Sequence, residues 1–328
     1  MVRVVLKVAV SGGLIFWLLS GIELDEIAKL LTRLEPLGLV CSVGLILLAL
    51  SIAALRWQLL LAAWGHSLGL WTLLSHVLVG NFFNQILPSS IGGDAVRIWR
   101  VSRAGLSLKV ATNSIIIDRL IGAAGLLILV VMGQFLSSSD NTDPVQNELV
   151  FLLIAAGTAA IVTAAILDKV PLPTRMRRWR WLAALGDLSR DFRSVLMAPR
   201  LAITLLMVST VMQAAGILSV YAISVALEIP VGWLDHLVLV PPALLMAMLP
   251  ISMAGWGVRE AVLVYSFAFV GVAAENALAV SVLFGVMSIF SGLPGAVLWF
   301  MTNRRKLDEI KHVSTTGTEG QSPRIGDD

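Results

Sequence analysis

The sequence predicts an all-α polytopic membrane protein. Of its 328 residues, 57% are hydrophobic and 14% are charged, a composition typical of chains that lie mostly within a bilayer. Apolar runs near the ~20 residues that a spanning helix needs recur along the chain. Two of the hydrophobic regions are interrupted by a similar Pro/Gly-rich sequence. Together these observations favour about six full spans with two broken helical hairpins between them, and they exclude a soluble domain.

Six apolar runs are predicted to be full spans, and they cover approximately residues 4 to 20, 38 to 63, 110 to 136, 149 to 167, 200 to 227 and 277 to 301. The first run follows Arg3 and Lys7, as the core of a signal peptide would. Because no convincing A-x-A cleavage site comes after it, we expect a retained first span.

The two interrupted regions, 71 to 104 and 233 to 271, carry related sequences. Residues 86 to 100 read ILPSSIGGDAVRIWR and residues 248 to 262 read MLPISMAGWGVREAV. Proline and glycine break helices, so each region is predicted to be a hairpin, either re-entrant or made of two short spans, and Pro241 and Pro242 are expected to break the second one earlier. In a bilayer, broken backbone is tolerated only beside protein or a water-filled cavity. The two breaks therefore indicate a polar substrate site near the membrane midplane.

Loop charges predict the orientation. Basic residues gather at the N-terminus, around Arg100 to Lys109, between 169 and 199, and after 303, whereas acidic residues dominate the opposite loops. By the positive-inside rule the basic loops and both termini are cytoplasmic, in a bacterial inner membrane. Three spans separate the hairpins, so the first enters from the cytoplasm and the second from outside. This parity predicts an inverted repeat, an arrangement that offers a simple route to alternating access.

One transmembrane domain is expected over residues 1 to 302, followed by a polar, disordered cytoplasmic tail over 303 to 328. Within the domain, residues 169 to 199 alternate apolar and basic positions at roughly helical spacing. Two interpretations stay open for this segment: a helix in the cytoplasmic interface, or a connecting loop whose charges only enforce topology.

Charges at membrane depth are the strongest candidates for function, because each costs several kcal/mol and normally faces a partner or a cavity. They are Arg56, Asp94, Arg97, Asp118, Arg119, Arg259 and Glu260. One reading is a substrate-binding cavity, and the other is a structural network in which Asp118 or Glu260 holds an arginine. We expect Arg97 and Arg259 to flank one polar cavity, with Pro88 and Pro250 close together at mid-depth.

In the first hairpin, Gly92 and Gly93 would allow close backbone approach, and a helix is expected to start near Asp94. Its free amides and positive dipole end would form an anion site, and Arg97 could grip a phosphate with two hydrogen bonds. Asp94 is either the helix N-cap or a contact for a substrate amine or hydroxyl.

Uncharged polar groups precede the first break. Asn81 and Asn84 add hydrogen-bonding groups near it, either as ligands or as contacts that hold helices together. The second hairpin repeats the glycine–arginine pattern with Gly255, Gly257, Arg259 and Glu260.

The remaining composition excludes several classes of site. Cys41 is the only cysteine, and His66, His76, His236 and His312 are widely spaced, so no metal site or other cofactor is predicted. No nucleophile–base set is evident, which argues against an enzyme. The net charge of +3 arises in short loops without interleaved aromatic residues, and we expect no nucleic-acid partner.

The combination of these motifs resembles a known family. An RW pair late in an early span, N-x-x-x-x-x-LP-x-x-x-GGD-x-x-R, a DR pair, and LP-x-S-x-x-G-x-G-x-RE are similar to the flippase-like membrane domain of the lysylphosphatidylglycerol synthase (multiple peptide resistance factor) family. The resemblance runs from about residue 5 to 302. The chain is similar to a stand-alone form without the aminoacyl-transferase domain. The site residues that the resemblance implies are Pro88, Gly92, Gly93, Asp94, Arg97, Asp118, Arg119, Gly257, Arg259 and Glu260.

The expected function is movement of a polar-headed, phosphate-bearing lipid between leaflets, with membrane phospholipids or glycolipids as partners. Two alternatives stay open. One is a membrane-embedded transferase or hydrolase that uses Asp94 or Asp118 as a base or metal ligand. The other is a scaffold that docks a separate lipid-modifying enzyme through its basic cytoplasmic loop. Oligomeric state is not predicted.

Overall fold

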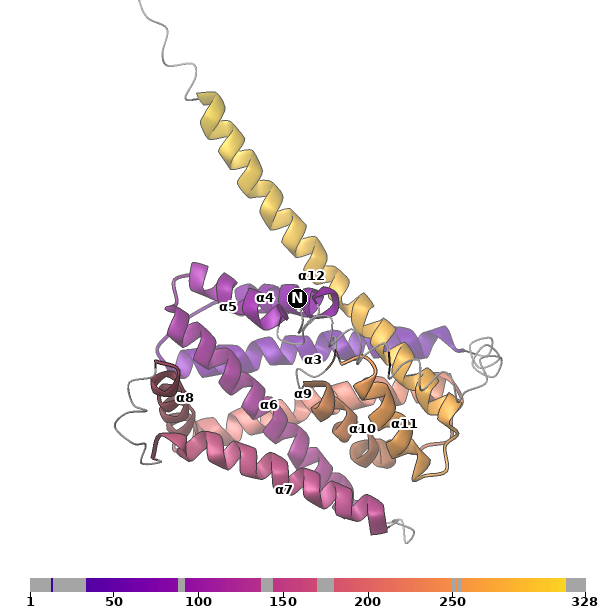
Figure 1. The fold of residues 1–328 in the computed structure, drawn as a ribbon. Coiled ribbons are helices and arrows are strands. Elements are labelled where there is room, and N and C mark those ends of the chain that lie inside the picture. Colours follow the sequence, from indigo (N-terminus) through magenta and orange to yellow (C-terminus); the bar gives the residue numbers. More distant parts are fainter. Residues whose placement is uncertain are drawn as a thin grey trace, which may run out of the picture.

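A computed structural model describes Gly13, Ser252 and residues 34–87, 92–136, 144–169, 180–248 and 255–316. Regular structure in these residues is entirely helical (Figure 1). The elements are α3 (Pro36–Ala63), α4 (Leu70–Ile86), α5 (Gly92–Arg103), α6 (Leu108–Leu136), α7 (Pro144–Ile166), the short 3₁₀ helix η1 (Leu167–Lys169), α8 (Arg180–Leu196), α9 (Pro199–Ala226), α10 (Trp233–Met248), α11 (Val258–Ala268) and α12 (Ala274–Thr316).

Five helices in the described part of the chain are long and apolar enough to cross a membrane: α3, α6, a segment from Asn147 to Lys169, α9, and α12 as far as Thr302. They coincide with five of the six predicted spans, and the sixth, residues 4 to 20, lies outside the described residues apart from Gly13. The all-α polytopic fold predicted from composition is confirmed.

Two helical hairpins occur where the Pro/Gly sequences lie. The first is α4 with α5 and the second is α10 with α11, and the helices within each hairpin pack on each other. Pro88 and Pro250, which were expected to meet at mid-depth, fall in the breaks and outside the described residues. In α4 and α5, the hydrogen bond from Arg100 Nε to His76 Nδ1, 3.0 Å long, fixes an antiparallel arrangement.

The expectation that Pro241 and Pro242 break the second hairpin is wrong. Both prolines lie inside α10, which continues through them to Met248. A proline removes one backbone N–H from the helical ladder and strains the preceding turn, yet neighbouring protein can satisfy the freed carbonyl groups inside a membrane bundle. Pro241 is buried, so this part of α10 is packed against other helices and the helix persists.

The described chain contains two similar four-helix units. The helices of the first unit, α3 to α6, contain 28, 17, 12 and 29 residues. Those of the second unit, α9 to α12, contain 28, 16 and 11 residues, and 29 to Thr302. Corresponding turns also match, because Gly65 (φ 80°) and Glu228 (φ 55°) each stand two residues after the first helix, and Gly105 (φ 105°) and Gly271 (φ 74°) each precede the fourth.

The two units run in opposite directions. The backbone N–H of Glu35, just before α3, donates to the carbonyl oxygen of Ala226 at the end of α9, at 3.1 Å. Nearer the other end, Arg56 Nη1 donates to Ser209 Oγ at 2.7 Å. These contacts make α3 and α9 antiparallel neighbours at the centre of the molecule (Figure 1). The pairings across the units are reciprocal, since α4 packs on α12 and α6 packs on α10.

The segment predicted as either an interfacial helix or a loop contains the helix α8. Phe192 and Val195 on α8 are buried in a cluster with residues of α3, α6, α7 and α9. Ser189 Oγ donates to Asp168 Oδ1 at 3.0 Å, which joins α8 to η1. This part of the segment is therefore packed helix. At the C-terminus, α12 continues to Thr316, past residue 302, and residues 317 to 328 of the predicted tail lie outside the described residues.

Candidate functional site

Five charged side chains from α3, α5 and α6 form a continuous row of ion pairs. Arg56 Nε donates to Asp118 Oδ1 at 2.8 Å, and Arg97 Nη2 lies 3.5 Å from Asp118 Oδ2. Arg97 Nη1 lies 3.6 Å from Asp94 Oδ1, and Asp94 in turn accepts from Arg119 Nε. Positive and negative groups alternate along the row, which contains three arginines and two aspartates. With all groups ionised, the row carries a net charge of +1.

The row lies deep within the membrane domain. Asp118 is ten residues beyond Leu108, about 15 Å along α6, which is half of the ~30 Å hydrocarbon core. Arg56, Asp94, Arg97 and Asp118 are all buried. Two further contacts brace the row, because Ser209 accepts from Arg56 and donates to the Ile121 carbonyl oxygen at 2.9 Å.

Arg97 is the least tightly held member of the row. Its ion-pair contacts are 3.5 and 3.6 Å, against 2.8 Å for Arg56 and Asp118. Its Nε atom is buried and has no hydrogen-bond partner among the described residues. The guanidinium is positioned by stacking on Trp57, 4.3 Å from the ring centroid. It is thus oriented by an aromatic face, while its hydrogen-bonding capacity is only partly used.

A cavity of about 380 Å³ borders this row, within the size range of small-molecule sites. Its wall includes the five charged residues of the row, the amides of Asn81, Asn84 and Gln213, and apolar side chains from both units. Leu244 and Met248 of α10 and Phe284 of α12 close the side that belongs to the second unit. Both hairpins therefore contribute to one polar cavity, mainly through their first helices.

The second hairpin's charged residues lie behind the cavity wall. Arg259 forms an ion pair with Glu260, and its Nε also donates to Ser281 Oγ at 3.3 Å. Its guanidinium carbon lies 5.4 Å from the Phe284 ring centroid, and that ring lines the cavity. The expectation that Arg97 and Arg259 flank one cavity is therefore wrong for this conformation, because Arg259 pairs with Glu260 and is not on the cavity wall, whereas Phe284 is.

Equivalent positions of the two units explain this asymmetry. Asp94 and Glu260 are each the third residue of their helices, and each pairs with an arginine. The eleventh residue of α6 is Asp118, whereas that of α12 is Phe284. At the same position of the repeated fold, the first unit has an aspartate that joins the charged row, and the second unit has a phenylalanine.

The glycine steps serve backbone geometry and helix packing. A Cβ on Gly93 would lie 1.9 Å from the Gly80 carbonyl oxygen, so Gly93 allows α4 and α5 to cross closely. The Gly93 N–H donates to Asn84 Oδ1 at 2.8 Å, which uses one amide of the expected anion site. Gly257 has φ 85° and its N–H donates to Glu260 Oε2 at 2.5 Å. Glu260 therefore caps α11 as well as pairing with Arg259.

The fifteen residues singled out from the sequence fall into three groups. Those on the cavity wall are Arg56, Asn81, Asn84, Asp94, Arg97, Asp118 and Arg119. Those described elsewhere in the structure are Gly92, Gly93, Gly255, Gly257, Arg259 and Glu260. Those outside the described residues are Pro88 and Pro250. Asp94 is the third described residue of α5 and lies in its first turn. Its carboxylate forms ion pairs with Arg97 and Arg119.

Sequence reasoning missed several contributors to the site. Ser209 and Gln213 stand in the otherwise apolar α9, and Gln213 donates to the Gly122 carbonyl oxygen at 2.9 Å. A polar residue in the middle of a span is a signal for such a role. Trp57 belongs to the RW motif of the resemblance, but nothing in the sequence indicated that its ring would face Arg97. Phe284 carried no signal, because an aromatic residue in an apolar helix normally indicates packing alone.

Comparison with known proteins shows the family of the chain. Residues 4–295 match the family model described as "Lysylphosphatidylglycerol synthase TM region". A "UPF0104 membrane protein" of Methanocaldococcus jannaschii is 29% identical over 130 residues, an alignment that covers 38% of this chain and 39% of that protein. The alignment thus spans well under half of the relative, whereas the family match spans nearly the whole chain. The protein is a multi-pass membrane protein that belongs to the lysylphosphatidylglycerol synthase transmembrane-region family.

Proposed function

We propose that the protein moves a phosphate-bearing lipid between the leaflets of the membrane, with the headgroup in the polar cavity and the acyl chains in the bilayer. The observation that carries this proposal is the unbalanced row of three arginines and two aspartates on the cavity wall. A structural network that only neutralised itself would need equal numbers of each charge. Within the described residues the row has one more positive charge than negative charges, positive charge at membrane depth is costly, and an anionic headgroup would add a stabilising partner.

Arg97 is the residue best suited to contact the phosphate. Its contacts with both aspartates are long, its Nε is unpaired within the described residues, and Trp57 holds its plane in position. A guanidinium can form two parallel hydrogen bonds with phosphate oxygens. Arg56, by contrast, is held by short bonds to Asp118 and Ser209, so its role is to anchor the row.

The fold supports a transporter through its two opposed units. Neither α4 with α5 nor α10 with α11 contains a helix of ~20 residues, and we infer that both hairpins are re-entrant. The start of α6, which follows the basic end of α5, lies beside α8, since Lys109 Nζ lies 2.6 Å from Asp187 Oδ2, and we infer from the basic residues there that this side is cytoplasmic. Exchange of conformation between two inverted units would expose the cavity to each side in turn.

A transport role fits the carboxylates better than an enzymatic one. Asp118 is shared between Arg56 and Arg97, and Asp94 between Arg97 and Arg119. Carboxylates engaged by arginines on both sides are not positioned to take a proton from a substrate. We therefore infer that the cavity binds and moves its ligand without changing it.

Reconstitution into proteoliposomes tests this function. The vesicles would contain phosphatidylethanolamine and phosphatidylglycerol with a trace of fluorescent phosphatidylglycerol, and added dithionite would bleach only the outer leaflet. We expect the protein to bring the inner pool within reach of the reagent, Arg97→Ala to lose this activity, and Arg103→Ala, an exposed arginine on the same helix, to keep it. Bleaching limited to the outer half with folded wild-type protein would overturn the proposal.

A further inference from the structure

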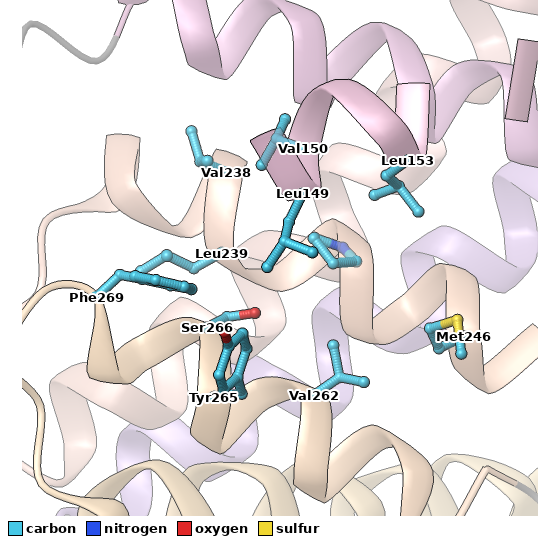
Figure 2. Close-up of a pocket in the computed structure, with 11 residues that line it drawn as sticks. Leu149, Val150, Leu153, Val238, Leu239, Met246, Val262, Tyr265, Ser266 and Phe269 are labelled. Atoms are coloured by element: carbon cyan, nitrogen blue, oxygen red, sulfur yellow. The ribbon is translucent and has the colours of Figure 1, made fainter. Parts of the chain in front are cut away.

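A second, almost wholly apolar pocket lies between α7, α10 and α11. Its volume is about 270 Å³, and it shares no lining residue with the polar cavity. Figure 2 shows side chains of the three helices around one elongated space, with Phe269 at one end and Met246 at the other. Only Tyr265 and Ser266 bring hydroxyl groups to its wall. The lining suits hydrocarbon and offers almost nothing to water or to a charged ligand.

The long axis of the pocket follows the helices across one leaflet. Phe269 comes just after the end of α11, and Met246 stands two residues before the end of α10. From Val238 to Met246 the wall extends over nine residues of α10, a rise of about 12 Å. The hydrocarbon region of one leaflet is about 15 Å deep. With the re-entrant hairpin inferred above, the pocket would run from a membrane surface toward the midplane, as an acyl chain does.

The pocket opens toward the bilayer. Leu149 and Tyr265 line it and are still 42% and 54% exposed. Beside them on α7, Phe151 and Leu152 are 72% and 62% exposed, so this helix presents an apolar surface to lipid. The Tyr265 ring packs edge-on against Phe269, with centroids 5.1 Å apart, which holds the rim in a defined shape. A lipid chain can therefore enter sideways without any helix having to unfold.

We propose that this pocket binds one acyl chain of a membrane phospholipid, whose headgroup rests at the surface where α7 begins and α11 ends. An empty apolar pocket forfeits dispersion contacts on its lining, and water does not fill such a space. The surrounding bilayer supplies hydrocarbon that is as apolar as the lining. The bound chain stabilises the contact between α7 and the second hairpin. This site goes beyond lipid transport, because it is occupied whether or not the polar cavity moves a headgroup.

Helix α10 separates the two sites, which makes them independently testable. Pro242 and Met246 face the apolar pocket, whereas Leu244 and Met248 face the polar cavity. Val262 on α11 lines the apolar pocket and lies on no part of the polar cavity wall. A large side chain at Val262 would therefore fill the acyl site and leave the charged row untouched.

Photocrosslinking in the membrane tests the proposal. The full chain is reconstituted in vesicles of phosphatidylethanolamine and phosphatidylglycerol that include a phosphatidylglycerol with a diazirine on one acyl chain, and adducts are mapped by peptide mass spectrometry. We expect adducts to concentrate in residues 149 to 153 and 262 to 269. Val262→Trp should lose them, whereas Ile203→Trp, on the lipid-exposed surface of α9, should retain them. Leu153→Phe provides a second pocket-filling variant should Val262→Trp fail to fold.

Three results would overturn the acyl site. The first is adducts spread evenly over the exposed surfaces of α7 and α9. The second is adducts that persist in a folded pocket-filling variant. The third is the absence of adducts in the pocket, which would mean that other parts of the protein close it. Arg97→Ala should leave the adducts unchanged. Failure of transport and failure of the acyl site are therefore distinguishable.

Discussion

Arg56 and Asp118 form a buried ion pair between α3 and α6, with Nε and Oδ1 2.8 Å apart and each side chain only 4% exposed. The same carboxylate also faces Arg97 on α5 at 3.5 Å. One aspartate thus couples a central helix, a full span and the second helix of a broken hairpin. Asp118 therefore helps to fix the position of the hairpin relative to α3 and α6.

Loss of the Asp118 charge should destabilise the fold. Asp118→Asn leaves Arg56 and Arg97 without their shared anion, and breaking a buried pair in this way costs about 3–5 kcal/mol. Thermal unfolding in detergent measures the effect. Asp235→Asn is the control, because Asp235 accepts a backbone hydrogen bond from Gly232 that an asparagine can keep. Equal unfolding temperatures for wild type and Asp118→Asn would mean that the ion pair does not hold the helices together.

The close crossing of α4 and α5 depends on Gly93. Gly93→Ala would place a methyl group against the Gly80 carbonyl oxygen and the Asn84 side chain, and such overpacking costs about 1–3 kcal/mol. Gly44→Ala on α3 is the matched control, because a Cβ there meets nothing within 4 Å. Both variants are compared by thermal unfolding. A neutral Gly93→Ala would show that the hairpin tolerates a wider separation of its helices.

The contact between α8 and α6 should weaken in acid. A hydrogen bond from Lys109, helped by the charges of Lys109 and Arg190, lowers the pKa of Asp187 below its ordinary value of 3.8. Because the folded-state pKa is depressed, the stabilisation is complete above the unfolded pKa near 4 and is lost as pH falls through the folded value. The pair is partly exposed, so the effect is at most about 1 kcal/mol.

Hydrogen exchange of the α8 amides between pH 6 and pH 3, expressed as protection factors, detects this change. In Asp187→Asn the protection should already be reduced at pH 6 and should vary less with pH. The same pH dependence in Asp187→Asn as in wild type would assign the effect to another group.

Cysteine labelling in sealed cells tests the topology. A suitable probe is Ala184→Cys on the exposed part of α8, in a Cys41→Ala background. It should react with an impermeant maleimide only after permeabilisation, because the positive-inside rule predicts that α8 is on the cytoplasmic side. Ala273→Cys, in the turn before α12, should react in intact cells. The opposite pattern would invert the whole map.

Much of the fold could be predicted because the bilayer imposes strong constraints on sequence. The lengths of α3, α6 and α9 follow from apolar runs that match the membrane thickness. The two hairpins follow from Pro/Gly pairs in matching order. The persistence of α10 through Pro241 and Pro242 could not be foreseen, because it depends on how the bundle packs around that helix.

The charged residues of the site could be found from sequence, but their pairing could not. A buried charge is conspicuous in an apolar helix, so Arg56, Arg97 and Asp118 were all identified as candidates. Which charges share one cavity depends on the register between helices, and that register is set by contacts such as Gly80 with Gly93. Arg259 pairs with Glu260 and lies off the cavity wall, which Phe284 lines, and this arrangement is visible only when both units are placed together.

The central claim is that Arg97 holds the phosphate of a lipid in the polar cavity, and native mass spectrometry of the purified protein tests it most directly. In a Val262→Trp background, phospholipid should remain bound when Arg97 is intact and when Arg103→Ala is added, be lost with Arg97→Ala, and be retained only in part with Arg97→Lys, since lysine cannot reproduce bidentate contacts. Pocket-filling Val262→Trp provides the background from which any lipid of the acyl site is absent. Equal phospholipid retention by Val262→Trp with and without Arg97→Ala, both folded, would contradict the account.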